Sequence, residues 1–137
     1  MNTRADIIDG PVPRGYAFVP DMDAGASSAA GAFGAELTFD GVVRADEHGR
    51  SLSALRYEVY QPMAQRQLSE LARQIVRAHS LLFLGVVHSR GVVPVGERSL
   101  RVIIRSRHRA ETLAGMGEFI DRLKHDVPIW KSPIWRG

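Results

Sequence analysis

The strongest periodic pattern in the chain runs through residues 63–79, MAQRQLSELARQIVRAH. Apolar side chains recur there at helical spacing, while arginine and glutamine occupy the opposite side. The apolar positions are Leu68, Leu71, Ala72, Ile75 and Val76. This pattern is typical of an amphipathic helix with one buried face, so we predict a helix that lies on a sheet.

Four other segments have the composition of β-strands. Residues 35–44 (AELTFDGVVR) and 52–60 (LSALRYEVY) flank the polar loop ADEHGRS, and we predict that they form a hairpin with a mobile loop. Residues 81–89 (LLFLGVVHS) and 100–106 (LRVIIRS) indicate two further strands, the first of them buried. The segment between these two, RGVVPVGERS, contains glycine and proline and predicts a connection.

A second helix is predicted from about Arg109 to His125. At about 100° per residue, one apolar stripe of this helix combines five positions. They are Leu113, Met116, Gly117, Ile120 and Leu123. Lys124 falls about 20° from Leu113 in the same projection and is expected to point with the core face. Pro128 disfavours helical backbone at the residue before it, so the segment VPIWK is expected to be extended and to fold back from the helix end.

Residues 1–33 show weak periodicity and contain three of the seven prolines together with the small-residue stretch AGASSAAGAFG. We predict an irregular N-terminal segment with room for one short helix. Residues 34–131 would then form a single α+β domain with a largely antiparallel sheet and two main helices, and residues 132–137 a short C-terminal tail.

Composition narrows the class of protein. The chain has 137 residues, of which 45% are hydrophobic and 24% charged, as expected for one folded domain. It holds no apolar run long enough to span a membrane and no signal-peptide pattern, so we predict a cytoplasmic protein without a membrane partner. The absence of cysteine excludes disulfides, thiolate zinc sites and a cysteine that carries sulfur.

The charge pattern favours a mixed surface over a nucleic-acid-binding one. The sequence pI is about 9.8, but the net charge is only +3. Acidic residues interrupt the arginines, and no basic run of five or more residues occurs. We therefore predict no nucleic-acid partner, whereas an anionic small molecule remains compatible with the sequence.

The two lysines of the chain, Lys124 and Lys131, lie close together in the sequence RLKHDVPIWK, although arginine is used sixteen times. Lys124 on a core-facing stripe must either extend its ammonium to the rim or sit in a pocket, where burial favours the neutral amine. If the extended segment folds back, Lys131 approaches Lys124, and the pair could serve acid–base chemistry or bind a phosphate or carboxylate. The alternative for Lys131 is a solvated side chain beside Trp130.

Two further places suit an anion. His108 and Arg109 lie where a strand ends and the second helix begins, and a helix N-terminus favours negative charge. The alternative is that Ser106 caps this helix and the arginines are solvated. Arg44, at the end of a predicted strand, could form a forked contact with an anion. The five histidines show no metal-ligand spacing, and no phosphate loop or nucleophile elbow occurs, so we predict neither a metal nor a cofactor.

Taken in order, the blocks FDGVVR, ALRYEVYQPMA, GVVPVGE, SRHRAE and RLKHDVPIWK resemble the catalytic (large) subunit of molybdopterin synthase, the MoaE family. The resemblance runs from about Gly34 to Lys131. It implies an α/β-hammerhead-type α+β fold and a homodimer of large subunits at the core of a heterotetramer. The partner it implies is a small ubiquitin-like sulfur-carrier subunit of the MoaD type, with a thiocarboxylated Gly-Gly C-terminus.

The resemblance also implies an activity. Cyclic pyranopterin monophosphate would receive two sulfur atoms from carrier thiocarboxylates and would become the dithiolene molybdopterin. Lys124 would be the catalytic amine and Lys131 a second active-site lysine. The substrate-binding residues implied by the family are Val42, Val43, Arg44, His108 and Arg109. A lysine fits this role because a desolvated amine can lose its proton, whereas a guanidinium effectively cannot.

Two departures from the family pattern keep a second hypothesis open. Ser132 and Pro133 follow the second lysine where relatives commonly have a charged residue and a glutamate, and the loop after Arg44 lacks the asparagine frequent in relatives. The alternative is a non-catalytic module of the same fold that docks a ubiquitin-like partner or an anionic ligand.

Overall fold

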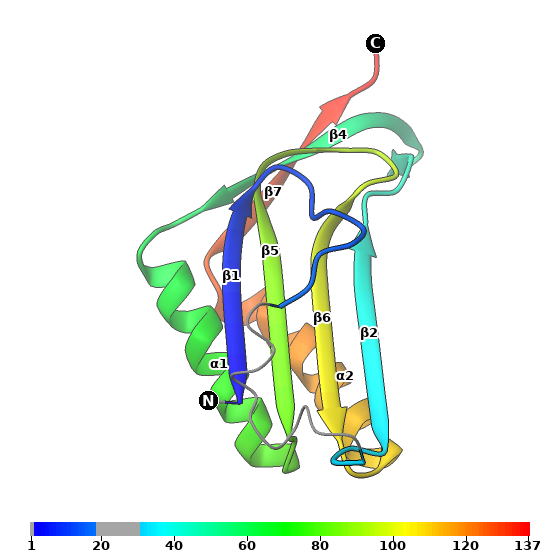
Figure 1. Cartoon of the computed structure of the whole chain (residues 1–137). Helices are drawn as coiled ribbons and strands as arrows, with labels where there is room; N and C mark the ends of the chain where they lie inside the picture. Colours follow the sequence, from blue (N-terminus) through cyan, green and yellow to red (C-terminus); the bar gives the residue numbers. More distant parts are fainter. Residues whose placement is uncertain (1, 19–30) are drawn as a thin grey trace.

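The computed structural model describes residues 2–18 and 31–137, which form a seven-stranded sheet and two helices. The two helices, α1 (Met63–His79) and α2 (Arg109–Asp126), lie side by side on one face of the sheet (Figure 1). Apolar side chains of both helices form the main core together with residues of the central strands. The α+β class and the largely antiparallel sheet predicted from the sequence are confirmed.

The sheet is organised around one long strand, β5 (Phe83–Pro94). Its first half pairs antiparallel with β6 (Arg98–Ser106), which in turn pairs with the edge strand β2 (Ala35–Val42). Its second half pairs with β4 (Arg50–Val59). Gly91, with φ of 93°, lies at the change of partner, where a left-handed residue lets the strand bend. The sheet therefore has a lower and an upper half that diverge at β5.

The upper half also contains the last strand of the chain. The strand β7 (Ile129–Trp135) pairs antiparallel with β4, and β3 (Asp46–Glu47) pairs with the start of β4. The extended, folded-back segment predicted after Pro128 is confirmed as a strand. It continues through residues 132–135, which were predicted to belong to a tail.

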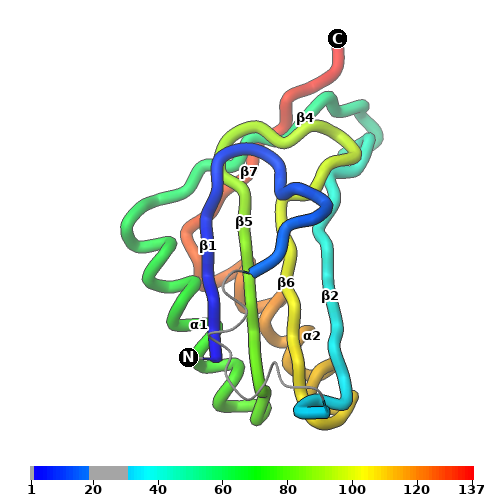
Figure 2. Tube along the Cα trace, in the orientation of Figure 1, coloured from blue at the N-terminus to red at the C-terminus, as the bar shows by residue number. Residues whose placement is uncertain are grey.

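The N-terminal segment corrects one prediction. Residues 3–9, expected to be irregular, form β1 (Thr3–Asp9), which runs parallel to β5 at the edge of the lower half (Figure 2). Ala5 and Ile7 of this strand pack against the main core. The pairing was not visible in the local pattern because its partner lies some eighty positions away, with Thr3 opposite Leu84. Residues 19–30, in the remainder of that predicted segment, lie outside the described residues.

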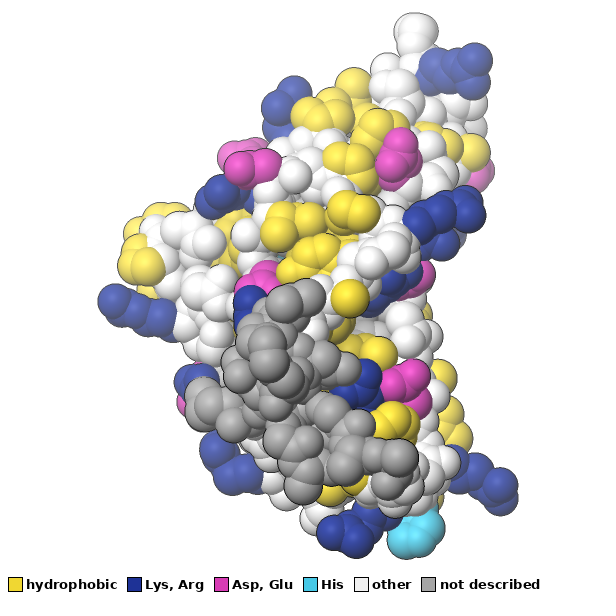
Figure 3. All heavy atoms as spheres, viewed as in Figure 1, with side chains coloured by type: hydrophobic (Ala, Val, Ile, Leu, Met, Phe, Trp, Pro, Cys, Tyr) yellow, Lys and Arg dark blue, Asp and Glu magenta, His cyan; other side chains and the backbone are white. Residues whose placement is uncertain are grey.

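The face of the sheet opposite the helices carries a second, smaller core. Val12 and Phe18 pack there against Phe83 and Val87 of β5. A Cβ on Gly85 would come within 2.8 Å of the Phe18 ring, so the glycine allows this close approach. Figure 3 shows this face, with apolar side chains in its upper part and lysine and arginine side chains around its outline.

The predicted hairpin of residues 35–44 and 52–60 is wrong. β2 pairs with β6, and β4 pairs with β5 and β7. The register of β2 shifts between Gly41 and Val42, and the chain then crosses from the lower to the upper half of the sheet. A much shorter hairpin joins β3 to β4 through His48 and Gly49, both with positive φ. The predicted connection of residues 90–99 is also shorter, because β5 continues to Pro94 and β6 begins at Arg98.

Helix α1 has the bounds that its pattern predicts, and all five expected positions are buried. In α2 the buried face differs from the predicted stripe. Its buried residues are Thr112, Gly115, Met116, Phe119 and Leu123. Leu113 is 58% exposed, because the row that packs on the sheet is centred on Phe119, and the neighbouring row that ends at Lys124 lies at the rim. Arg122 also reaches from α2 to Gln74 on α1, which fixes the two helices relative to each other.

Candidate active-site cleft

A cleft of about 600 Å³ opens where the two halves of the sheet diverge above the C-terminal end of α2. This volume is in the range of small-molecule sites in proteins. One wall is the end of β2 with the residues that follow it, and the opposite wall is the last two turns of α2 with the start of β7. Strands β4, β5 and β6 form the floor. The lining residues are Phe39, Asp40, Gly41, Val42, Val43, Arg44, Glu47, Leu55, Tyr57, His88, Ser99, Leu100, Ile120, Leu123, Lys124, Ile129 and Lys131.

The structure brings five of the predicted site residues together in this cleft: Val42, Val43, Arg44, Lys124 and Lys131. Val43 is buried, and Arg44 extends into solvent with 78% of its side chain exposed. The prediction that Lys124 points with the core face is wrong: the side chain is exposed in the last turn of α2, so of the two alternatives left open by the sequence the structure shows the one at the rim. Lys131 pairs with Tyr57 across β7 and β4 and faces the cleft at its upper side.

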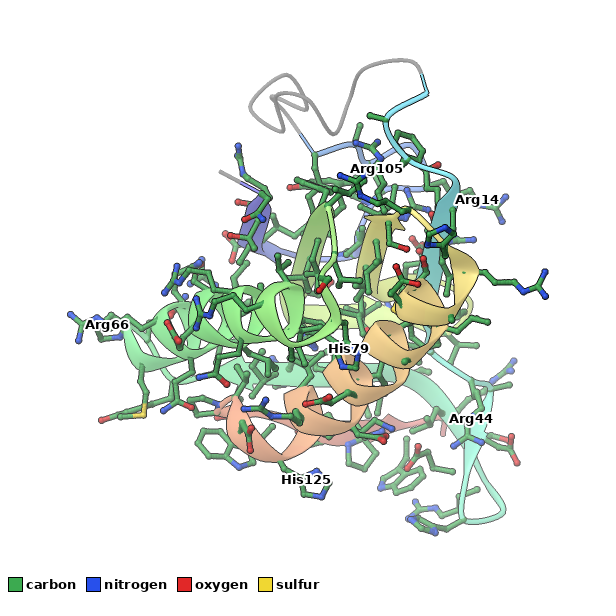
Figure 4. The ribbon with its side chains drawn as sticks, turned by 90° about the horizontal axis from the view of Figure 1, so that it is seen from below. Arg14, Arg44, Arg66, His79, Arg105 and His125 are labelled. Carbon is green, nitrogen blue, oxygen red and sulfur yellow. The ribbon has the colours of Figure 1, made fainter. Side chains whose placement is uncertain are left out.

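Glu47 offsets part of this positive charge. Its Oε1 atom lies 3.7 Å from Arg44 Nη2 and 3.9 Å from Lys131 Nζ. The Glu47 side chain is only 20% exposed, and the tight turn that follows it contains two residues with positive φ, His48 and Gly49. Figure 4 shows Arg44 on the connection that precedes the β3–β4 hairpin, beside α2. One acidic side chain thus stands between two of the rim cations.

The floor of the cleft combines the apolar Leu55 and Leu100 with polar side chains that carry no charge. His88 is 7% exposed, and its ring packs edge-on against Tyr57 with centroids 5.2 Å apart. The Tyr57 hydroxyl donates a hydrogen bond of 3.0 Å to Ser99 Oγ. Burial lowers the pKa of His88 and raises the pKa of Tyr57, so both side chains are held in their neutral forms near neutral pH.

Asp40 ties the β2 wall to the neighbouring strand. Its carboxylate accepts hydrogen bonds of 2.8 Å from Arg98 Nε and from Arg101 Nε. The hydrogen bond from Arg101, with that from Arg98, holds the pKa of Asp40 below its ordinary value. This network fixes β2 next to the point where the chain leaves the sheet, and so it fixes the position of the cleft wall.

His108 and Arg109 are not part of the cleft. They lie at the N-terminal end of α2, about 22 to 24 Å from Lys124 along the helix axis at 1.5 Å per residue. The His108 side chain is 77% exposed, with Nδ1 at 3.6 Å from Glu111 Oε2. Ser106 does not cap the helix: its hydroxyl donates to the His108 carbonyl and contacts Thr112 Oγ1. Within one chain, these two residues cannot contact the same small molecule as Lys124.

Five polar lining residues were missed in the sequence: Asp40, Glu47, Tyr57, His88 and Ser99. A signal was present for His88, which ends the apolar run LLFLGVVH and is therefore a polar side chain on a buried strand. The spacing between histidines, which indicates metal ligands, does not reveal a single buried histidine of this kind. No comparable signal marks Glu47, whose position depends on the turn that follows it.

No group of acidic or histidine side chains that could hold a metal ion occurs in residues 2–18 and 31–137. In the same residues, neither helix is long and apolar enough to cross a membrane.

Comparison of this chain with a family profile and with curated protein sequences points to the same family. The sequence profile described as MoaE protein matches residues 19–126. Among curated relatives, the molybdopterin synthase catalytic subunit of Oryza sativa is 42% identical over 104 residues, which cover 76% of this chain and 54% of the relative. The Dictyostelium discoideum protein of the same name is 34% identical over 122 residues, covering 88% of this chain and 72% of the relative. The chain spans about half the length of the Oryza sativa relative.

Solved structures agree with this family. The molybdopterin synthase structure from Staphylococcus aureus has a TM-score of 0.78 and 26% identity, with 96% of this chain and 90% of that chain covered. The complex of subunits 1 and 2 of molybdopterin-converting factor from Helicobacter pylori shares the fold at 24% identity, with a TM-score of 0.69 and coverage of 96% and 88%. By profile, sequence identity and fold, this chain belongs to the MoaE protein family.

Proposed function

We propose that this chain is the catalytic subunit of a molybdopterin synthase. The observation that carries the proposal is the convergence of Lys124, Lys131 and Arg44 on one cleft of small-molecule size. The family and the names of the relatives support it. The reaction would transfer two sulfur atoms, one from each of two thiocarboxylated carrier C-termini, to cyclic pyranopterin monophosphate, which forms the dithiolene of molybdopterin and leaves each carrier with a carboxylate.

The chemistry of the cleft suits this reaction. A thiocarboxylate and a cyclic phosphate are both anionic, and three cations line the rim that they would meet. We assign to Lys124 the proton transfer at the reacting centre, because an amine can exchange its proton more readily than a guanidinium. Lys131 and Arg44 would hold negative charge on the substrate and the carrier tail. The chain has no cysteine, so the sulfur must arrive on another molecule.

The partner we propose is a small ubiquitin-like carrier of the MoaD type. The Helicobacter pylori structure that shares this fold is a complex of two subunits, which supports a two-protein assembly. A flexible Gly-Gly tail would enter the cleft as an extended peptide, with its terminal anion at the lysines. We also propose that the reaction takes place in the cytoplasm.

We further propose that two copies of this chain form the core of the assembly. His108 and Arg109 lie about 22 to 24 Å from Lys124 along α2, so they could bind the same substrate only from a second copy. Mixing two inactive variants tests this arrangement. Lys124→Ala and Arg109→Ala chains are each expected to lose activity, and mixed dimers should regain part of it in sites that receive both intact residues. Mixed dimers without activity would exclude a shared site.

The test of the activity is a reconstituted reaction of this protein with a thiocarboxylated carrier and cyclic pyranopterin monophosphate. Dithiolene product should form with the unaltered chain and disappear with Lys124→Ala. Lys124→Arg should also be inactive, because it keeps the charge but not the exchangeable amine. Arg66→Ala removes an exposed cation that does not line the cleft and that lies on the opposite side of Figure 4 from Arg44, so this control variant should retain activity.

The alternative of a non-catalytic binding module makes a different prediction. It is motivated by Ser132 and Pro133, which occupy strand β7 opposite Arg56 and Leu55. Under that hypothesis, the protein would bind both carrier and substrate but form no product in conditions where a known synthase is active. Product formation that requires Lys124 would exclude it.

A further inference from the structure

The cleft floor contains a histidine to which the proposed reaction assigns no role. Along β5, alternate side chains Leu84 and Val86 point to the helix side and belong to the main core. His88 is the next residue on that face. It stands where the core face of the sheet ends and the cleft begins, and it lines the cleft. A polar ring therefore replaces an aliphatic side chain at the boundary between core and cleft.

The protonation of the His88 ring follows from its hydrogen bond. Its Nδ1 atom lies 2.8 Å from the carbonyl oxygen of Ser89. A carbonyl oxygen can only accept, so Nδ1 carries the proton. In the neutral ring, the second nitrogen Nε2 then holds a lone pair and can only accept a hydrogen bond. Burial lowers the pKa of His88, which keeps the ring neutral.

The lone pair of Nε2 opens into the cleft. No described residue forms a hydrogen bond with this atom. In the described part of the chain, Ser89 Oγ is the buried side-chain polar atom that lacks a hydrogen-bond partner. Nε2 is therefore accessible, and because His88 lines the cleft, the cleft is where a donor can reach it.

The neighbouring side chains complete an uncharged recognition surface. Tyr57 uses its hydroxyl proton in the bond to Ser99 Oγ, so the Ser99 hydroxyl keeps its own proton for another acceptor. The floor thus offers an acceptor from His88 and a donor from Ser99, whereas the cations Arg44, Lys124 and Lys131 lie at the rim. A ligand that matches this layout has an uncharged polar ring at the floor and an anionic group at the rim.

We propose that His88 Nε2 accepts a hydrogen bond from a ring N–H of the substrate and so selects the heterocycle rather than the phosphate. This inference rests on the proposed function, because it assigns a residue to the recognition of a pterin-type substrate in the same cleft. The residue contacts the ring and sets its orientation, while proton transfer stays with Lys124 at the rim.

The first test needs no substitution. Long-range ¹H–¹⁵N spectra of the unaltered protein distinguish the two neutral tautomers of a histidine. The His88 ring should show the Nδ1–H form, and its Nε2 resonance should move toward the hydrogen-bonded position when cyclic pyranopterin monophosphate is added. It should not move when inorganic phosphate is added. An Nε2–H tautomer, or an Nε2 resonance that does not shift when the pterin is added, would overturn the inference.

The second test uses a matched pair of variants. His88→Asn keeps a donor near the position of Nδ1 and removes the atom at the position of Nε2, whereas His88→Gln can place an amide oxygen there. Calorimetric titration should give binding of cyclic pyranopterin monophosphate that is about 3- to 10-fold weaker for His88→Asn, the effect expected of one neutral hydrogen bond. His88→Gln should recover part of the loss. The affinity for inorganic phosphate should be the same in all three proteins.

The outcomes separate the two proposals. If the unaltered chain neither binds the pterin nor forms product, the proposed function fails and this inference with it. If it forms product and His88→Asn binds the pterin equally well, only the inference fails. Equal weakening of pterin and phosphate binding in a folded His88→Asn protein would indicate a general loss of cleft structure and would also overturn the inference.

Discussion

Replacing Glu47 with glutamine should tighten the binding of an anion in the cleft. Glu47 lies within 4.0 Å of two rim cations, with Oε1 at 3.7 Å from Arg44 and 3.9 Å from Lys131. An anionic ligand that approaches these cations must compete with the carboxylate and is repelled by it. Glutamine keeps the size and polarity of the side chain but removes the charge.

The expected gain in anion affinity follows from the distances between Glu47 and the two cations and from the exposure of those cations. Two unit charges about 4 Å apart interact with about 1 kcal/mol in bulk water and about 4 kcal/mol at an effective dielectric constant of 20. Arg44 is 78% exposed and Lys131 56% exposed, so both contacts lie near the value for water. Removing the competing charge should therefore favour an anion by about 1 to 2 kcal/mol, which is about 5- to 30-fold in affinity.

The assay is calorimetric titration of the unaltered protein and Glu47→Gln with cyclic pyranopterin monophosphate and with inorganic phosphate. The gain in affinity should shrink between about 50 mM and about 500 mM salt, because the groups are exposed and screened. Glu58→Gln is the matched control: Glu58 follows Tyr57 on β4, so its side chain points to the opposite face, and it is exposed. Unchanged anion affinity in Glu47→Gln, or an equal gain in Glu58→Gln, would refute the reasoning.

Three further predictions concern stability. Phe119→Ala should lower the free energy of unfolding by about 3 to 5 kcal/mol in chemical denaturation, since the ring is fully buried, whereas Leu113→Ala on the same helix should change it by less than about 0.5 kcal/mol. The pKa of Asp40 is lowered by its hydrogen bond from Arg101, so its stabilising contribution is complete above the unfolded value of about 3.9 and is lost as the pH falls through the lower, folded value. Denaturation from neutral to acid pH should show this loss in the unaltered protein and not in Asp40→Asn. The pKa of His88 is also lowered, so the unfolded chain binds its proton first as the pH falls, and the stability of the unaltered protein relative to His88→Gln should decrease below about pH 6.5.

What the sequence could predict depended on the range of the interactions involved. Helix α1 was predicted at both ends because its amphipathic pattern is local and Pro62 precedes it. Strand β1 and the partner of β2 were not predicted, because they depend on pairings between residues far apart in the sequence, such as Thr3 with Leu84 and Ala35 with Ser106. Periodicity describes which side chains share a face, but it does not describe which strand covers the neighbouring edge.

The same limit applies to the cleft. Lys124 and Lys131 could be expected to line the same cleft, because they are close in the sequence and Pro128 between them ends the helix and reverses the chain. His88 and Tyr57 lie on different strands and become neighbours only through the pairing of β4 with the second half of β5. The buried face of α2 lies one row of side chains away from the predicted stripe, because the sequence does not show how a helix is rotated about its axis on the sheet. That rotation decides that Lys124 lies at the rim.

The arrangement of charge in the cleft follows from the cost of desolvation. Burying an unpaired charge is expensive, whereas a neutral polar group can be buried when it forms hydrogen bonds. Accordingly, the neutral His88 and Tyr57 lie at the floor, and Arg44, Lys124 and Lys131 remain exposed. A substrate with an uncharged ring and an anionic group would bind with its charge at the rim, where a carrier tail could also reach it. Variants at different positions should then affect different steps. Glu47→Gln should change the affinity for the anion, and His88→Asn should change the affinity for the ring. Lys124→Arg should change the rate of turnover.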